Sequence, residues 1–223
     1  MTHLKQVVLG IFCLVALSSC NTYPDKDNIV NSQLVSLTQF NTKKDFTQYK
    51  TFLVSDSMCV LASDGKSTTM VKNKISEILR NQSIQCMTAY GYTQAMKEVK
   101  PDLIINLSGV ENTNVSYSFL PWGFYNPYYW GYWGDWGDYY YDWDYYYPYY
   151  PMLTSAYTTG SALIEMLDLK NTTIDSNKKQ IETIWVGIIR GIMDYNHSSS
   201  EITNAINLCF SQTNTPPFIN TKR

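Results

Sequence analysis

Runs of apolar residues with two different spacings divide the chain into expected strands and helices. Short runs rich in β-branched and aromatic residues, bounded by polar turn residues, predict strands. Such runs occupy residues 34–40, 49–54, 84–93, 102–111, 157–169 and 181–193. The polar residues 171–179 predict the turn between the last two strands.

The last two strands also predict which side chains share a face, because successive strand residues point to opposite sides of a sheet. One face of the first strand is expected to hold Ala162, Ile164, Met166 and Asp168. One face of the second strand is expected to hold Ile184, Val186 and Ile188, and the opposite face Trp185 and Ile189.

Two segments show the spacing of an amphipathic helix. The first is expected to be capped by Thr68 or Thr69, and its apolar stripe consists of Val71, Ile75, Ile78 and Leu79. The second begins at a capping box, in which Ser198 is followed by Glu201. Its apolar stripe consists of Ile202, Ala205, Ile206, Cys209 and Phe210.

Two helices and six expected strands predict an α+β fold, in which the helices pack on a mostly antiparallel sheet. This single domain is expected to span residues 34–218, and a long aromatic-rich insertion at 117–151 interrupts it. Residues 1–19 are expected to form a signal peptide, 20–33 a lipidated tether and 219–223 a tail.

The N-terminal residues have the features of a secretory signal peptide. After a weakly basic start, the apolar run at 7–17 is 11 residues long, too short for the ~20 residues that span a bilayer. Ser18 and Ser19 stand directly before Cys20, and this arrangement resembles the lipobox of bacterial lipoproteins. The resemblance implies cleavage before Cys20 and acylation of that cysteine; an ordinary secreted protein is the alternative. In such lipoproteins an aspartate directly after the cysteine favours the inner membrane. This chain has Asn21 there, which implies attachment to the outer membrane. Whether the protein faces the periplasm or the cell surface stays undecided.

The insertion at 117–151 is the most unusual part of the composition. Twenty of its 35 residues are aromatic, including 13 of the 19 tyrosines and five of the six tryptophans of the chain. It contains four aspartates and no basic residue, and glycine and proline interrupt any long helix or strand. A segment of this length without regular structure is usually functional or disordered.

Four interpretations of the insertion remain open. It can be a binding platform for glycan or another envelope partner, since tyrosine and tryptophan dominate binding surfaces. It can contact the membrane interface, where these residues concentrate, or self-associate. It can also be an insert that partly folds back on the domain and has no binding role. The expected contact residues are Trp122, Trp130, Trp133, Trp136, Trp143, Tyr139 and Tyr146.

No motif in the sequence supports catalysis, and no catalytic residue, cofactor or metal site is expected. Phosphate-binding and dinucleotide-binding fingerprints do not occur. Gly160-Ser161 lacks the following glycine of a nucleophile elbow, and His197 stands in a polar loop. The aspartates of the insertion do not have the spacing of the known calcium loop; they are Asp135, Asp138, Asp142 and Asp144.

Charge and cysteine content argue against two further classes of protein, nucleic-acid binders and zinc proteins. The chain has 17 Lys+Arg and 19 Asp+Glu, a net charge of −2, and no basic run, which argues against a nucleic-acid partner. Cys59, Cys86 and Cys209 lack the short paired spacing of a zinc site. They are either three buried thiols or one disulfide and a spare thiol.

Six short blocks, in order, resemble a family of bacterial outer-membrane lipoproteins of the Bacteroidota type that is catalogued as a domain of unknown function. The blocks are Asp45-Phe46-Thr47-Gln48-Tyr49-Lys50-Thr51-Phe52, Gly91-Tyr92, Pro101-Asp102-Leu103, the strand Thr159 to Asp168, Ile184-Trp185-Val186-Gly187 and the helix before Pro216-Pro217. Val186 departs from the arginine that the family often has, and the aromatic loop is longer than a family member needs. The resemblance implies fold and location and transfers no catalytic residue.

We therefore expect a lipid-anchored cell-envelope protein that acts as a non-catalytic binding module. Its partners are the membrane, through the lipid on Cys20, and an envelope glycan, lipid or protein, through the insertion. The alternatives are a structural lipoprotein that self-associates through the insertion, and a domain whose insertion has no binding role.

Overall fold

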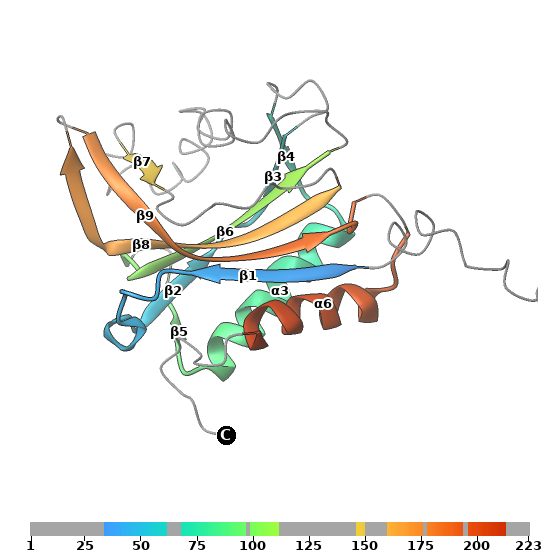
Figure 1. The fold of residues 1–223 in the computed structure, drawn as a ribbon, viewed down its shortest axis with the longest axis horizontal. Helices are drawn as coiled ribbons and strands as arrows, with labels where there is room; N and C mark the ends of the chain where they lie inside the picture. The colour runs from blue at the N-terminus through green and yellow to red at the C-terminus, as the bar shows by residue number, and fades with distance from the viewer. Residues whose placement is uncertain are drawn as a thin grey trace, which may run out of the picture. The chain divides into compact units, whose positions relative to one another are not determined.

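The computed structural model describes residues 34–61, 68–96, 99–111, 146–149, 160–175, 178–193 and 196–212. The expected signal peptide, tether and tail, and most of the aromatic insertion, lie outside these ranges. The described residues form an α+β structure (Figure 1), which confirms the predicted class.

Nine strands form one sheet within the described residues. They are β1 (Val35–Phe40), β2 (Thr51–Val54), β3 (Met58–Leu61), β4 (Thr68–Val71), β5 (Thr93–Gln94), β6 (Leu103–Val110), β7 (Tyr146–Tyr149), β8 (Ser161–Asp175) and β9 (Lys178–Arg190). A 3-10 helix, η1 (Phe46–Gln48), precedes β2, and the α-helices are α3 (Lys74–Ala89) and α6 (Ser199–Ser211).

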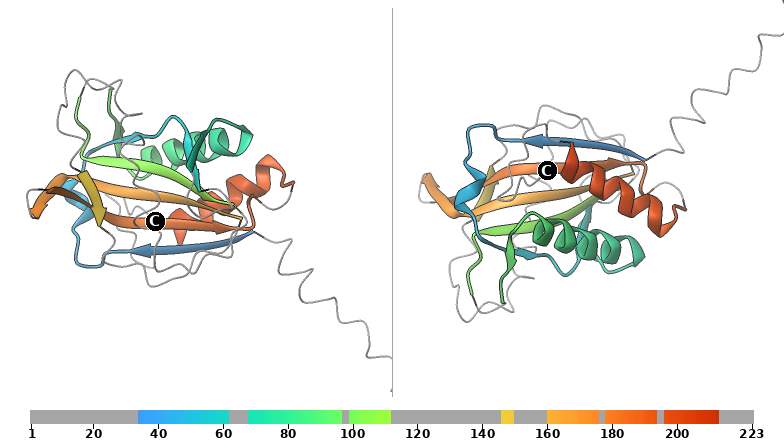
Figure 2. Two further views of the ribbon diagram at one scale, coloured as in Figure 1. Left: turned by 90° about the horizontal axis from the view of Figure 1, so that it is seen from above. Right: turned by 90° about the horizontal axis from the view of Figure 1, so that it is seen from below.

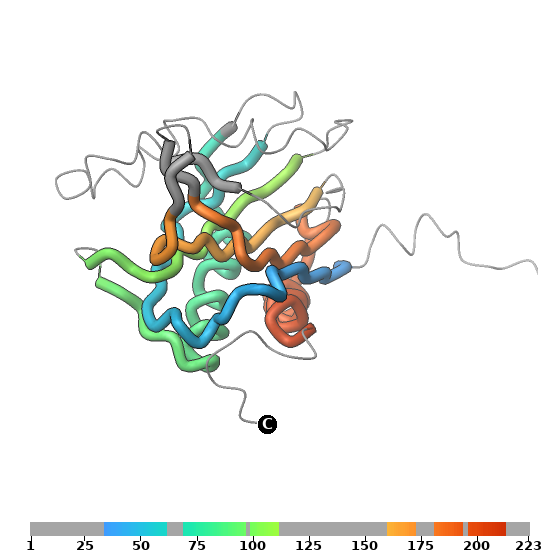
Figure 3. The backbone as a smooth tube through the Cα atoms, turned by 60° about the vertical axis from the view of Figure 1, so that its left-hand side comes forward, coloured from blue at the N-terminus to red at the C-terminus, as the bar shows by residue number. Residues whose placement is uncertain are grey.

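The sheet is mixed, with the order β1-β9-β8-β6-β2-β5, while β3 and β4 extend from β6 and β7 attaches to β9. Strand β8 is antiparallel to β6 and β9, but β2 and β3 run parallel to β6. The expectation of a mostly antiparallel sheet of six strands was therefore wrong. Parallel neighbours need a long crossover connection, and α3 supplies it between β2 or β3 and β6. Figure 3 shows β1 beside β9, although the two are far apart in sequence.

The first helix begins later and runs further than the pattern predicts. Thr68 and Thr69 lie in β4, and Asn73 caps α3 instead, accepting a hydrogen bond from the Ser76 backbone N–H at 2.9 Å. The predicted strand at 84–93 was wrong, because it is the second half of α3 followed by β5. The buried stripe of α3 continues into that half at helical spacing and consists of Ser76, Leu79, Ser83, Cys86 and Met87.

The second predicted helix is confirmed. Ser198 Oγ accepts from the Glu201 backbone N–H at 3.2 Å, and the Ser198 N–H donates to Glu201 Oε2 at 2.8 Å, which completes the capping box. All five residues of the predicted stripe are buried. The helix lies close to β9, since a Cβ at Gly187 would meet the Cys209 Cβ at 2.9 Å and the Trp185 ring at 2.7 Å.

A β-bulge changes the predicted faces of β9. The β8–β9 ladder shifts register between Met166 and Leu167, and Ile184 is the extra residue on β9. Ile184 therefore packs in the same core cluster as Trp185, whereas Val186 belongs to the cluster on the opposite face. The prediction that Ile184 and Val186 share a face was wrong, and the separation of Val186 from Trp185 is confirmed.

The predicted turn at 171–179 is part of a longer hairpin. Beyond a second register shift, Thr173 pairs with Gln180 and Asp175 with Lys178. The polar residues therefore extend the β8–β9 ladder beyond the second register shift. In Figure 1 this end of the hairpin bends away from the helices.

The two faces of the sheet carry separate apolar clusters. Both α-helices lie on one side of the sheet (Figure 2), which we call the helix-covered face. We call the opposite side, over which the described ranges place no helix, the helix-free face. Its buried apolar residues, each at most 6% exposed, are Leu53, Cys59, Leu61, Ile104, Val110, Leu163, Leu167, Leu169, Ile181, Val186 and Ile188.

Candidate functional site

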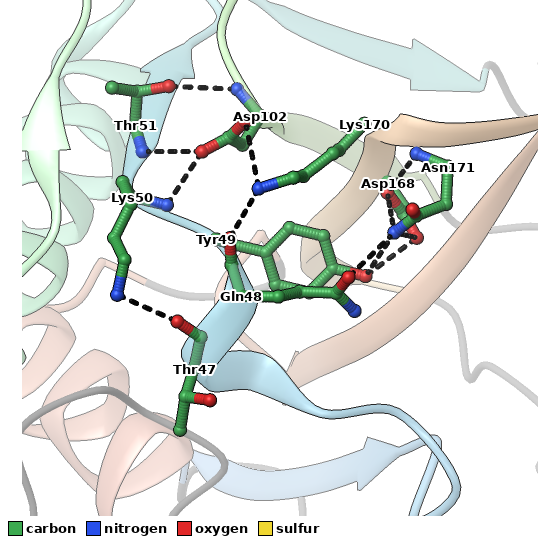
Figure 4. A network of polar contacts seen from close by, with 9 residues as sticks. All are labelled: Thr47, Gln48, Tyr49, Lys50, Thr51, Asp102, Asp168, Lys170 and Asn171. Atoms are coloured by element: carbon green, nitrogen blue, oxygen red, sulfur yellow. Dashed lines mark hydrogen bonds and ion pairs between the residues drawn. The ribbon is translucent and has the colours of Figure 1, made fainter.

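A cluster of charged and polar side chains lies where the segment before β2 meets β8 and β9, and Figure 4 shows three of its members, Tyr49, Asp168 and Asn171. We call Lys44, Tyr49, Asp168, Asn171 and Glu182 the edge network. Its centre is the Asp168 carboxylate, whose side chain is fully buried. Asp168 accepts hydrogen bonds from the Tyr49 hydroxyl at 2.6 Å, from Lys44 Nζ at 3.0 Å and from the Asn171 backbone N–H at 2.9 Å.

Lys44 joins the two long strands through two carboxylates. Its Nζ lies 3.0 Å from Asp168 on β8 and 2.7 Å from Glu182 on β9. Glu182 also accepts from Asn41 Nδ2 at 2.6 Å. The segment between β1 and β2 is therefore fastened to the middle of the β8–β9 hairpin.

The environment holds these groups in one protonation state. Burial, together with the hydrogen bond to Asp168, raises the pKa of Tyr49, so the phenol stays protonated and acts as a donor. Burial by itself would raise the pKa of Asp168, but hydrogen bonds from Tyr49, Asn171 and Lys44 outweigh it and lower that pKa. Burial would likewise lower the pKa of Lys44, but its bonds to Glu182 and Asp168 outweigh it and raise that pKa.

A second carboxylate, Asp102, organises the start of β2. Its Oδ2 accepts from the backbone N–H groups of Lys50 at 2.7 Å and Thr51 at 3.2 Å, while its own N–H donates to Thr51 Oγ1 at 2.9 Å. Lys170 Nζ donates to the Gln48 carbonyl at 2.6 Å and lies 3.8 Å from Asp102 Oδ1. These contacts, drawn in Figure 4, give a structural role to Thr51 of the first sequence block and to Asp102 of the third.

The edge network is suited to fastening the fold rather than to chemistry. The charged groups face each other, and each carboxylate is held by donors of this chain. A general base needs a pKa near the working pH, whereas the pKa of Asp168 is lowered and that of Tyr49 is raised. Within the described ranges, no three metal-ligating side chains come together.

A polar group also lies within the helix-free face. Asn106 on β6 pairs across the ladder with Glu165 on β8. Glu165 Oε2 accepts from Asn106 Nδ2 at 2.7 Å and from Ser108 Oγ at 2.9 Å. All three side chains are buried, Glu165 being 3% exposed. A buried carboxylate is costly unless donors surround it, and Asn106 and Ser108 supply such donors here.

The strands that flank the insertion pair up to the point where it begins. Val110 at the end of β6 pairs with Ser161 at the start of β8, and the Gly160 N–H donates to the Val110 carbonyl at 2.9 Å. Gly160 has a φ of 72°, in the left-handed region that glycine favours. Between them, strand β7 pairs in parallel with residues 179–182 of β9.

The structure places only one of the expected contact residues. Tyr146 is the first residue of β7 and pairs with Lys179. The other expected contacts, the four aspartates considered for calcium and the expected lipidation site Cys20 lie outside the described residues. Sequence reasoning missed the edge network and the Glu165 triad. A signal was present, because Asp168 and Glu165 interrupt an otherwise apolar strand.

Cys59, Cys86 and Cys209 form no disulfide and are buried, on β3, α3 and α6 respectively. Burial raises the pKa of Cys86, and it raises the pKa of Cys209 to about 12. A thiolate is the nucleophilic form of cysteine, so Cys86 and Cys209 are poor nucleophiles at neutral pH and pack as small apolar side chains.

Comparison with known proteins assigns the family. No curated protein matches the chain. A crystal structure of a DUF4136 family protein from Bacteroides thetaiotaomicron is similar, with a TM-score of 0.58 and 26% identity over 85% of this chain and 99% of that one. The family model described as domain of unknown function (DUF4136) matches residues 36–212, which span both α-helices and every strand but the first residue of β1. The chain therefore belongs to the DUF4136 family.

Proposed function

We propose that this protein is anchored to the outer membrane through a lipid on Cys20 and binds an envelope glycan through its aromatic insertion, without catalysing a reaction. The domain serves as the scaffold that presents the insertion. No α-helix in the described ranges has the length and apolar character to cross a membrane.

One observation carries the proposal: the pairing of β6 with β8 does not need a long connection between these two strands. Strands β6 and β8 are antiparallel neighbours that pair up to Val110 and Ser161. Two residues are enough to join such strands, yet residues 111–160 separate them here. Long loops on a rigid scaffold usually carry function, which supports a binding role for this segment.

The composition of the insertion favours glycan over the bilayer. Tyrosine and tryptophan present flat amphipathic rings at little cost in rotamer entropy, and such rings can stack on sugar faces. The insertion has four aspartates and no basic residue. Negative charge is repelled from an anionic membrane surface, so a lipid surface suits this segment less well.

Tryptophan fluorescence tests the proposal, and the structure makes the signal simple to interpret. Trp185 is fully buried, so iodide quenching of the purified full chain reports on the five tryptophans of the insertion. Peptidoglycan fragments or lipopolysaccharide should reduce quenching, whereas phosphatidylglycerol vesicles should not. Quenching that no glycan changes would contradict the proposal, and a particle size that grows with protein concentration would favour self-association.

The anchor is tested separately in cells. Cys20→Ala should leave an unprocessed precursor or release the protein from the outer-membrane fraction. Ser18→Ala is a matched control, because it keeps a small residue before the cysteine. Normal processing and lipid labelling of Cys20→Ala would contradict lipid attachment at this residue.

A further inference from the structure

The helix-free face has the character of an interior surface. Its apolar residues come from strands alone, and each is at most 6% exposed. Val186 and Ile188 on β9 and Leu163 on β8 are among them. An exposed face of this size would be an aggregation liability or a contact site. The face therefore needs an occupant, and the described helices lie on the other side of the sheet.

The aromatic insertion begins and ends at the margin of this face. It leaves β6 after Val110 and returns to β8 at Gly160, and Val110 itself belongs to the face. In between, β7 pairs with residues 179–182 of β9, which include the face residue Ile181. The insertion is thus tied to three strands whose side chains build the face.

The chemistry of the insertion also suits the face. Its 20 aromatic residues supply apolar area, at about 150–250 Å² for each buried ring. The Glu165 carboxylate lies within the face and accepts hydrogen bonds. Tyrosine O–H and tryptophan N–H groups are donors, and the insertion contains 18 such residues and no lysine or arginine.

We infer that the helix-free face is the docking surface of residues 112–159 of the same chain. The protein then has three layers: the helices, the sheet and an aromatic layer whose inner rings pack on the strands. This inference does not depend on glycan binding. Only some of the 20 rings are needed to cover the strands, and the outer ones remain for the contact proposed above.

Limited proteolysis with chymotrypsin, which cleaves after aromatic residues, tests the docking without any ligand. Two neighbouring residues of β8 provide a matched pair, because Leu163 points to the helix-free face and Ile164 to the helix-covered face. Cleavage under native conditions follows local opening. In the purified full chain, Leu163→Ala should raise the cleavage rate within 112–159 by about tenfold or more, and Ile164→Ala by about twofold at most.

Each result decides the inference. A wild-type insertion that is cut as fast as in urea, or equal acceleration by both variants, would overturn it. Protection from chymotrypsin that appears only at high protein concentration would assign the face to a second copy and would also overturn the inference.

If Leu163→Ala does not fold, iodide quenching of the wild-type full chain decides the inference. Docked tryptophans are quenched several-fold less in buffer than in urea, and equal quenching overturns the inference. Ligand-independent protection with no glycan response would support docking and contradict glycan binding, so the two proposals fail separately.

Discussion

The helix-covered face and the helix-free face are buried to a similar degree, but they differ in what the sequence provides to cover them. The first cluster includes residues of α3 and α6, with exposures up to 8%, and the second consists of strand residues with exposures up to 6%. The helices are recognisable from their 3.6-residue apolar spacing. The candidate cover of the other face has no such periodicity and is rich in aromatic residues.

The residue pattern of the central strands indicates that both faces of the sheet are covered. A sheet with one solvated face shows alternating apolar and polar residues, whereas a sheet buried on both faces shows continuous apolar runs. Residues 161–169 of β8 are all buried, and so are 183–189 of β9. Most of these buried residues are apolar, with Glu165 and Asp168 as charged exceptions, and this pattern is typical of strands that are covered on both faces.

The largest effect is expected from Trp185→Ala on the helix-covered face. Trp185 is fully buried and its ring centroid lies 4.8 Å from that of Phe210 on α6. Truncating a large buried aromatic residue costs about 3–5 kcal/mol. Urea denaturation measures this loss. Leu208→Ala on the exposed side of α6 is the control, and it should change the free energy of unfolding by less than about 0.5 kcal/mol.

Ile188→Ala makes the corresponding change on the helix-free face. Ile188 lies three residues further along β9 and is also fully buried. If the two faces are equivalent interiors, the loss should be about 2–5 kcal/mol, measured by the same urea titration. A loss below about 0.5 kcal/mol, typical of surface positions, would show that the helix-free face is not packed and would break the comparison.

The edge network predicts that the stability of the fold depends on pH. The pKa of Asp168 is lowered in the folded chain, so its contribution is complete above the unfolded pKa of ~3.9 and disappears as the pH falls through the lower folded value. The pKa of Lys44 is raised, so its contribution is complete below ~10.4 and disappears as the pH rises through the higher folded value.

Asp168→Asn should therefore destabilise the protein by about 1–3 kcal/mol at neutral pH, because it removes the charged acceptor from Tyr49 and Lys44. The difference between variant and wild type should shrink below about pH 4. Thermal melts between acid and neutral pH measure this trend, with exposed Glu111→Gln as the control. A constant difference across the range would show that the carboxylate charge of Asp168 does not stabilise the fold.

The sequence predicted the elements that follow a single local rule. The strands β1, β2, β6, β8 and β9 and the helix α6 are near their expected positions, because alternation and a capping box are short-range signals. The start of α3 was missed because Asn73 caps it with Ser76 at the third position, where the expected glutamate or glutamine is absent. The prediction of a strand at 84–93 was wrong because Cys86 and Met87 continue the apolar stripe of α3 at helical spacing from Leu79.

The remaining features depend on contacts that no local pattern encodes. The parallel pairing of β2 with β6 follows from the crossover through α3, and the Ile184 bulge follows from the register of β8 against β9. Tyr49 and Asp168 are 119 residues apart. Their sequence positions show polar residues near apolar ones, but only the folded sheet shows that they form a bond.

The smallest effect is expected at the helix caps, which belong to the helix-covered layer alone. Ser198→Ala and Asn73→Ala each remove a side-chain acceptor from a backbone N–H of the first turn, at 3.2 Å in α6 and 2.9 Å in α3. Loss of such a cap costs about 1 kcal/mol, which urea denaturation resolves. Because neither residue lies on the helix-free face, chymotrypsin cleavage of residues 112–159 should keep the wild-type rate to within about twofold. A cap variant that speeds this cleavage as much as Leu163→Ala would show that the two layers open together rather than independently.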